Sequence, residues 1–351
     1  MTRIRVHASV PYDVEIGAGS SASAPMFVRE TLRNARRIAL VTDSNVDRLH
    51  AAPVSAGFVA TGLEVLKFVF PAGERSKTLS TYGDMMDFLA RGRLDRTDLV
   101  VALGGGVTGD MAGFAAATYK RGIAFVQIPT SLLAMVDSSV GGKTGVDLSA
   151  GKNLVGAFHQ PRAVFCDTSF LGTLPDEWWI DGMGEVLKYA VLGDGSLFAK
   201  LEGAPLGKIG EREIAECVGM KRDVVEKDER EGGARKLLNL GHTFAHAIEM
   251  LSGYSISHGR AVATGIAMIA RAAMNMGALP RPEQERIESL ALSMGYDVRT
   301  DFPAKEIAEV ILSDKKVFGD HIDLVVPHGI GKCFVESVPL AELGKVVDSA
   351  V

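Results

Sequence analysis

The sequence predicts an N-terminal α/β domain followed by a mainly α-helical domain, with the boundary near residue 174. The 351 residues are too many for one small core and suit two domains of ordinary size. Before residue 174, short apolar segments alternate with helical patterns, as in mostly parallel sheets. Beyond it, apolar residues recur with helical spacing. We therefore expect domains at residues 1–174 and 175–351.

The first domain is expected to contain a parallel sheet. Its strands are predicted at residues 36–41, 98–103, 123–128 and 162–166, where short apolar segments occur. The second of these segments leads into three consecutive glycines, and a helix is expected to begin directly after them.

The second domain is expected to be built mainly from helices. They are predicted at about 182–203, 211–229, 236–251, 259–277 and 281–294. A late strand is predicted at residues 321–326, and Pro339 is a candidate first residue of a last helix.

Composition excludes several classes of partner. The formal net charge of −5 provides no general basic field for nucleic acid or an anionic membrane, so an anionic ligand needs a local cluster of cations. Three well-separated cysteines indicate a reducing compartment rather than a disulfide framework. No apolar segment reaches about 18 residues, and the N-terminus does not read as a signal peptide. We expect a cytoplasmic protein.

The segment LGGGVTGD, residues 103–110, is a candidate phosphate-binding loop. Glycines allow a phosphate to approach the backbone, and the following helix offers free N–H groups. The spacing departs from GxGxxG, and a tight turn that requires positive φ is the alternative interpretation. Asp43, at the end of a predicted strand, is either a ribose-binding carboxylate or a helix N-cap.

Residues 138–153, SSVGGKTGVDLSAGKN, read as a long glycine-rich loop with two lysines. Their GGKT resembles the end of a P-loop, but Asp137 occupies the position that requires the first glycine. Nucleotide hydrolysis is therefore not predicted. A polar loop of this length within a compact domain is more often functional than a spacer.

Four polar residues, Arg235, Asn239, His242 and His246, recur at spacings of 4, 3 and 4, which predicts one polar stripe on one helix. The flanking residues are apolar, and buried polar groups need partners, so the stripe favours a binding site. HxxxH without the metalloprotease glutamate is by itself a weak zinc signal.

Three further residues are candidates for the same site. His258 could join the histidine pair as a metal ligand or could be a helix cap or core residue. Glu185 and Lys188 lie three residues apart on an apolar helix, which predicts an ion pair. If Glu185 is buried it needs a cation, and either a metal ion or Lys188 could provide it.

The motifs together resemble those of 3-dehydroquinate synthases, in order and over nearly the whole chain. They are FPAGERSKT (70–78), LGGGVTGDMAGFAAATYKRG (103–122), IPTSLLAMVDSSVGGKTGVDLSAGKNLVGAFHQP (128–161), GEVLKYAV (184–191), KDEREGG (227–233), LLNLGHTFAHAIE (237–249), SHGRAVA (257–263) and DKK (314–316).

The resemblance implies a dehydroquinate synthase-like fold, with a dinucleotide-binding α/β domain and a helical domain for metal and substrate. It implies a divalent ion, zinc or cobalt, held by Glu185, His242 and His258. His246 is then a substrate residue near the transferred phosphate rather than a ligand.

The resemblance also implies contacts to NAD and to a sugar-acid phosphate. The implied NAD contacts are Asp43, Asn45, Glu74, Lys77, Gly105, Gly106, Asp110, Thr130, Ser131, Lys143, Phe170 and Thr173. The implied substrate contacts are Arg121, Asp137, Lys152, Asn153, Lys188, Lys221, Arg235, Asn239, His246 and one of Lys315 and Lys316. Those implied to be catalytic are Lys152, Lys188, Lys221, Arg235, Asn239 and His246.

The implied reaction is a lyase-type cyclisation of 3-deoxy-D-arabino-heptulosonate 7-phosphate. It combines transient oxidation by NAD, β-elimination of phosphate, reduction and an intramolecular aldol closure to 3-dehydroquinate, a step of the shikimate pathway to chorismate and the aromatic amino acids. Family members are often homodimers. The alternatives are a sister sugar-phosphate cyclase, a glycerol-dehydrogenase-like metal-dependent oxidoreductase and a non-catalytic dinucleotide-binding protein.

Overall fold

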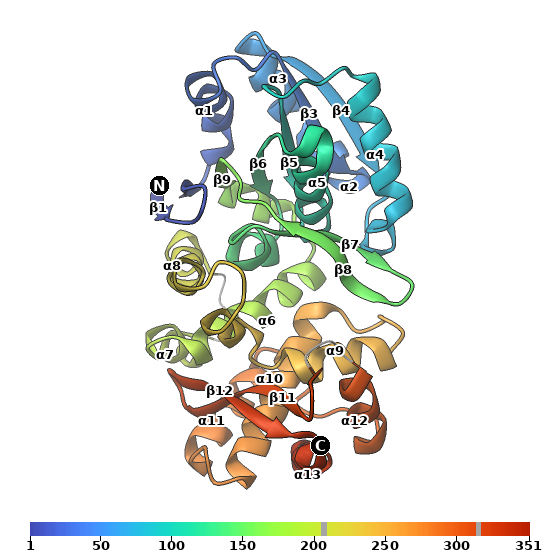
Figure 1. Cartoon of the computed structure of the whole chain (residues 1–351). Helices are drawn as coiled ribbons and strands as arrows, with labels where there is room; N and C mark the ends of the chain where they lie inside the picture. The colour runs from blue at the N-terminus through green and yellow to red at the C-terminus, as the bar shows by residue number, and fades with distance from the viewer. Residues whose placement is uncertain (205–208, 314–316) are drawn as a thin grey trace. The chain divides into compact units, whose positions relative to one another are not determined.

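A computed structural model describes residues 1–204, 209–313 and 317–351 of the chain (Figure 1). The described residues divide into two compact units. Unit 1 comprises Met1–Trp179 and Gly210–Glu229, and unit 2 comprises Ile180–Ile209 and Arg230–Val351. The contacts thus assign residues 210–229 to the N-terminal unit. The predicted boundary near residue 174 instead assigns all later residues to the second domain. In the described part of the chain, no helix combines the length and apolar character that crossing a bilayer requires.

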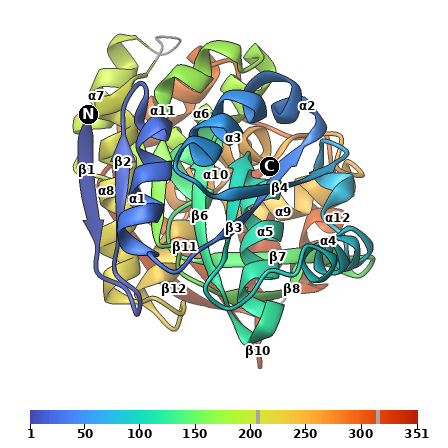
Figure 2. The same cartoon turned by 90° about the horizontal axis from the view of Figure 1, so that it is seen from above.

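Unit 1 is organised around a sheet with the described strand order β1-β2-β9-β6-β5-β3-β4. The strands are β1 (Thr2–Val6), β2 (Tyr12–Ile16), β3 (Arg37–Asp43), β4 (Glu64–Phe70), β5 (Leu99–Gly104), β6 (Ala124–Pro129) and β9 (Ala163–Cys166). β1 pairs with β2 in antiparallel fashion, and the other neighbours are parallel. Figure 2 shows β1 beside β2. In the strand order, β3 lies between β5 and β4.

The order of the strands creates a reversal point in this sheet. From β3 the chain adds β4 on one side, and it then returns to place β5 on the other side. The carboxyl ends of β3 and β5 flank this point. Ligands of open α/β sheets bind outside the carboxyl ends of the strands at such a reversal.

One face of the sheet is covered by helices α4 (Leu79–Arg91) and α5 (Gly106–Thr118). Met85, Leu89 and Met111 from these helices pack with Val41 and Val100 of the strands in one buried apolar cluster. This burial fixes the position of α5, whose N-terminus directly follows β5 at the carboxyl edge.

Two further elements complete the site-bearing part of unit 1. A hairpin of β7 (Lys143–Leu148) and β8 (Gly151–Phe158) contacts α5, and α8 (Glu211–Lys227) packs on β1 and β2. The expectation of a long loop at residues 138–153 is therefore wrong. Gly145 and Gly156 of the hairpin permit close strand pairing, because a Cβ at Gly145 would lie 2.6 Å from the carbonyl oxygen of Val155 and one at Gly156 would lie 2.1 Å from that of Thr144.

Unit 2 is mainly helical and also holds a small sheet. Its helices are α6 (Asp176–Leu192), which begins in unit 1, α7 (Ser196–Gly203), α9 (His242–Leu251), α10 (His258–Asn275), α11 (Arg281–Ser293), α12 (Ala304–Ser313) and α13 (Leu340–Ala350). The described sheet order is β10 (Val317–Phe318), β11 (His321–Gly329) and β12 (Lys332–Pro339).

The structure confirms the fold class and the predicted strands at β3, β5, β6, β9 and β11. Two helix predictions are wrong. The helix expected at 182–203 is divided between α6 and α7, because Gly195 has φ 88°. The helix expected at 236–251 is interrupted by Gly241, which has φ 77°, between the short helix η7 (Ala234–Asn239) and α9.

Candidate metal centre and nucleotide-binding edge

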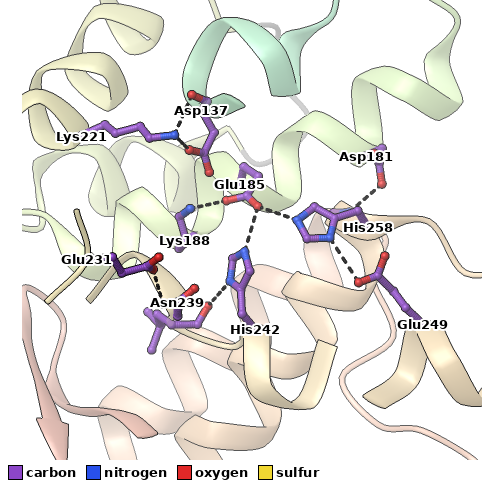
Figure 3. Close-up of polar contacts among 12 residues, drawn as sticks. Asp137, Asp181, Glu185, Lys188, Lys221, Glu231, Asn239, His242, Glu249 and His258 are labelled. Carbon is purple, nitrogen blue, oxygen red and sulfur yellow. Dashed lines mark hydrogen bonds and ion pairs between the residues drawn. The ribbon is translucent and has the colours of Figure 1, made fainter. Parts of the chain in front are cut away.

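Three buried or half-buried donors meet within unit 2. Glu185 lies on α6, His242 is the first residue of α9, and His258 is the first residue of α10. One potential ligand atom from each lies within 4.8 Å of the others (Figure 3). The Oε1 atom of Glu185 is 3.4 Å from Nε2 of His242 and 3.1 Å from Nε2 of His258. The arrangement is compact enough for one ion to contact all three.

Helices α6 and α10 cross where each carries a glycine, so their backbones come into direct contact. A Cβ at Gly259 would lie 1.7 Å from the carbonyl oxygen of Asp181, and a Cβ at Gly184 would lie 2.0 Å from that of Gly259. The backbone N–H of Gly259 donates to Oδ1 of Asp181 at 2.7 Å. Because Gly184 precedes Glu185 and Gly259 follows His258, this contact sets Glu185 beside His258.

A second glycine contact brings α9 to α10. A Cβ at Gly265 would lie 2.2 Å from the carbonyl oxygen of Gly241. The left-handed conformation of Gly241 ends η7 and allows α9 to start at His242. The interruption removes Arg235 and Asn239 from the helix that carries both histidines, so the predicted single polar stripe is wrong.

Each imidazole of the cluster is oriented through its Nδ1 atom. Nδ1 of His242 lies 3.2 Å from the carbonyl oxygen of Leu240, which can only accept a hydrogen bond. Nδ1 of His258 lies 3.3 Å from Oε2 of Glu249. With the proton on Nδ1, the Nε2 atom of a neutral ring presents its lone pair toward Glu185, as a metal ligand must.

The charges around the cluster are consistent with a cation site. Burial raises the pKa of Glu185, but the ammonium of Lys188, 2.5 Å from Oε2, and the two imidazoles outweigh it and hold that pKa well below its usual range. Burial lowers the pKa of His242 to about 4. Burial also lowers the pKa of His258, but Glu185 and Glu249 outweigh this and raise it to about 10. The two carboxylates therefore attract a positive charge beyond that of Lys188, and a divalent ion would provide it.

The other predicted residues of unit 2 lie near this cluster or are buried. The His246 ring is 5.7 Å from that of His242 and 6.4 Å from that of His258. Arg235 is only 1% exposed. Asn239 Nδ2 donates to Glu231 Oε1 at 3.0 Å. Glu231, Glu249 and Asp181 were not singled out in the sequence, although KDEREGG and HTFAHAIE contain two of them. Lys315 and Lys316 lie outside the described residues.

At the carboxyl edge of the unit 1 sheet lie the glycine loop and its neighbours. None of Gly104, Gly105 and Gly106 has a positive φ, so the turn interpretation is wrong. Close approach explains them instead, since a Cβ at Gly105 would lie 3.3 Å from Oγ of Ser131. Thr130 follows β6 at the same edge and donates its N–H to the carbonyl of Gly104 at 3.0 Å.

Asp43 ends β3 and caps α2 (Ser44–Val46). Its Oδ1 atom accepts from the backbone N–H groups of Asn45 and Val46, at 2.8 and 3.1 Å. Asp43 is therefore a helix N-cap, one of the two roles expected from the sequence. Only its Oδ1 atom accepts the capping hydrogen bonds. A ribose contact through Oδ2 stays a prediction.

A buried polar network joins the start of α5 to the β7–β8 hairpin. Nζ of Lys77 lies 2.7 Å from Oδ2 of Asp110 and 2.6 Å from Oδ1 of Asn153. Burial lowers the pKa of Lys77, but Asp110 and Glu74 outweigh it and raise that pKa above its ordinary value. Nζ of Lys152 lies 3.6 Å from Oε1 of Glu74. Residues predicted for NAD and for substrate thus share one network.

His50 connects two segments at the same edge, although no motif or spacing in the sequence indicates this role. Its ring lies 4.4 Å from that of Phe170, in the short helix η6 (Thr168–Thr173) after β9. Its Nε2 atom is 2.8 Å from Oγ1 of Thr173, whose hydroxyl donates to the Phe170 carbonyl at 2.9 Å. The imidazole is therefore the donor to Thr173. Only tertiary contact, not spacing, reveals this residue.

Four more predicted residues of unit 1 lie elsewhere. Nζ of Lys221, on α8, pairs with Oδ1 of Asp137 and donates to its carbonyl at 2.7 Å. Arg121 lies between α5 and β6, near the amino ends of the strands. Gly105 follows the carboxyl end of β5, at the other edge of the sheet. The structure therefore does not bring Arg121 to the other predicted residues of this unit. Lys143 opens β7.

Fold and cluster together place the chain in the dehydroquinate synthase-like class. Two family models match it: 3-dehydroquinate synthase N-terminal over residues 67–181 and 3-dehydroquinate synthase C-terminal over residues 182–317. The 3-dehydroquinate synthase of Ruegeria sp. (strain TM1040) is 42% identical, over 97% of this chain and 95% of that protein. The chain belongs to the 3-dehydroquinate synthase family.

Solved structures of two other synthases are similar to this chain over nearly its whole length. One is 2-deoxy-scyllo-inosose synthase complexed with carbaglucose-6-phosphate, NAD+ and Co2+, with 25% identity, a TM-score of 0.87 and 100% of both chains covered. The other is ValA, the 2-epi-5-epi-valiolone synthase of Streptomyces hygroscopicus subsp. jinggangensis 5008, with NAD+ and Zn2+ bound. It has 25% identity, a TM-score of 0.85 and 99% of both chains covered.

Proposed function

We propose that this protein is a 3-dehydroquinate synthase, which converts 3-deoxy-D-arabino-heptulosonate 7-phosphate into 3-dehydroquinate and phosphate. The observation that carries the proposal is the convergence of Glu185, His242 and His258 in a chain that matches this family over nearly its whole length. Identity to the named synthase is 42%, against 25% for the two sister cyclases. This difference favours dehydroquinate as the product.

The proposed cofactors are NAD and one divalent metal ion, zinc or cobalt. The bound NAD would accept and return a hydride, and the ion would make a substrate hydroxyl more acidic. Glu185, His242 and His258 would hold the ion, since one carboxylate and two imidazoles with oriented Nε2 atoms suit either metal. Gly105 and Gly106, at the start of α5, would receive the pyrophosphate.

The substrate carries a phosphate and a carboxylate, and buried cations would bind them. In unit 2, Lys188 and Arg235 are each 1% exposed. Burial strengthens the attraction between such cations and an anion, and arginine can bind two oxygens at once. These local charges would capture the substrate despite a net charge of −5.

The decisive assay supplies purified protein with the heptulosonate phosphate, zinc and NAD well below the substrate concentration. We expect phosphate to be released in many equivalents per NAD, without accumulation of NADH, and the product to be 3-dehydroquinate by mass spectrometry and NMR. Steady accumulation of NADH would instead support an oxidoreductase. Formation of a different carbocycle from another sugar phosphate would support a sister cyclase. Absence of phosphate release would support a non-catalytic dinucleotide-binding protein.

We also propose a cytoplasmic homodimer. The three cysteines are thiols in the structure, and Cys166 and Cys217 are buried, which is consistent with a reducing compartment. Burial raises the pKa of the Cys333 thiol to about 12, which keeps it protonated. Dimerisation is proposed from the family resemblance, and light scattering of the purified protein would test it.

His50 is expected to contribute to NAD affinity, because it joins the segment after β3 to the segment that carries Phe170 and Thr173. Replacing His50 with alanine removes one hydrogen bond and one ring contact, each worth about 0.5–1.5 kcal/mol. We expect the Kd for NAD, measured by calorimetry, to rise about 10-fold. At saturating NAD, the rate of phosphate release should stay within about twofold.

His159→Ala is the matched control for this measurement. The His159 ring also stacks on a phenylalanine, Phe125 at 5.3 Å, and its Nε2 lies 2.9 Å from the carbonyl of Ile123. These contacts lie near the amino edge of the sheet, so the affinity for NAD should not change. Equal affinities for NAD in wild type and His50→Ala would exclude the role given to His50.

A further inference from the structure

A buried carboxylate stands directly behind one of the proposed metal ligands. Glu249 is 2% exposed, and its Oε2 atom lies 3.3 Å from Nδ1 of His258, on the side of the ring away from Glu185 (Figure 3). A buried carboxylate is costly unless it is paired with a positive or hydrogen-bonding group. The proposed reaction chemistry gives Glu249 no role, so this burial needs another explanation.

The position of Glu249 follows from the helix that carries it. α9 begins with His242, and Glu249 is seven residues later, or about two helical turns, so both side chains lie on the same face. That face contacts α10, which begins with His258. One helix therefore supplies a donor in its first turn and a carboxylate in its last turn, on either side of the His258 ring.

The two ligand imidazoles are oriented by different acceptors. His242 uses the carbonyl oxygen of Leu240 two residues before it, which backbone geometry already fixes. His258 lies at the start of a helix and is 31% exposed, so its ring has more freedom to rotate. A carboxylate at Nδ1 restricts that rotation and makes Nε2 a stronger donor to a metal.

We propose that Glu249 is a positioning residue of the metal centre, which holds the His258 ring with Nε2 toward Glu185 and increases metal affinity. The proposal rests on the proposed function, because it requires the Glu185, His242 and His258 cluster to bind a divalent ion. Glu249 is not itself a ligand in this arrangement, since Nδ1 of His258 lies between its carboxylate and the cluster.

The test compares zinc affinity in wild type, Glu249→Gln and Glu249→Ala by competition with a chromophoric chelator. We expect the Kd for zinc to rise about 10–100-fold in Glu249→Gln, because outer carboxylates of metal-bound histidines have effects of this size. The Glu249→Ala variant should bind zinc at least as weakly as Glu249→Gln. The cobalt-loaded Glu249→Gln protein should also show an altered visible absorption spectrum, because the donor strength of His258 changes.

Glu336→Gln is the matched control. Oε1 of Glu336 also lies beside an imidazole of unit 2, 2.5 Å from Nε2 of His328, but this pair is outside the cluster. Its zinc affinity should equal that of the wild type. The isosteric Glu249→Gln variant remains informative if Glu249→Ala does not fold, and thermal unfolding of the metal-free proteins measures any structural effect separately.

Two results would overturn the proposal, and they are distinguishable. Wild-type zinc affinity and an unchanged cobalt spectrum in Glu249→Gln would exclude the positioning role while leaving the metal centre intact. A wild-type protein that binds neither zinc nor cobalt would overturn the metal centre itself, and the proposed function with it.

Discussion

Replacing His258 with alanine is expected to release the metal ion and to lower the rate of phosphate release by at least about 1,000-fold, since metal catalysis supplies several kcal/mol. The change reduces the donor set from three side chains to two. It also removes the imidazole between Glu185 and Glu249, two carboxylates that are 1% and 2% exposed. Elemental analysis of the dialysed protein and a phosphate-release assay would measure both effects.

His321→Ala serves as the control for this prediction. His321 belongs to the same unit, but its side chain is 43% exposed, and it pairs with the neighbouring Asp320. Metal content and turnover should remain those of the wild type. If His258→Ala retained the full metal content after dialysis, His258 would not be a ligand.

Gly259→Ala is expected to have the second-largest effect, on both stability and metal affinity. A methyl group there would lie 1.7 Å from the carbonyl oxygen of Asp181, so α6 and α10 would have to separate. Forcing extra atoms into a packed interior costs about 1–3 kcal/mol, and a buried backbone contact has little room to relax. Because the crossing sets Glu185 beside His258, the Kd for zinc should rise as well. Urea unfolding of the metal-free protein and chelator competition would measure the two effects.

Gly344→Ala is the matched control for the crossing. Gly344 lies within α13 of the same unit, and beyond the local backbone of that helix no described atom lies within 4 Å of where its Cβ would be. Alanine there should stabilise the protein by about 0.5–1 kcal/mol, because it favours the helix. If Gly259→Ala were equally stable, the close crossing would not be required.

Much of the sheet could be predicted because strands buried on both faces are continuous apolar segments. β3, β5 and β6 are of this kind, and their residues are almost entirely buried. β4 is an edge strand with a mixed exposure pattern, and the sequence did not indicate it. The β7–β8 hairpin resembles a loop in sequence because Gly145 and Gly156 interrupt its apolar pattern, although close backbone pairing rather than a turn requires these two glycines.

The proposed metal centre could be predicted only partly from the sequence. Spacing placed His242 and His246 one helical turn apart, but it could not distinguish a metal ligand from a substrate-binding residue. It also left two possible cations for Glu185, a metal ion and Lys188. Family resemblance supplied the set of three. Glu249 and His50 were missed because their partners lie on other elements of the chain. Periodicity within one helix carries no information about contacts with another element.

The assignment of α8 to unit 1 has a consequence for dissecting the molecule. A fragment that starts at Ile180 retains every proposed metal ligand, but it also carries α8 without the strands β1 and β2 on which that helix packs. Ile214, Cys217, Val218 and Val225, buried in the intact protein, would then face water. A metal-binding fragment that remains monodisperse would therefore require excision of residues 210–229 and rejoining of the flanking ends, because no single cut separates the two units.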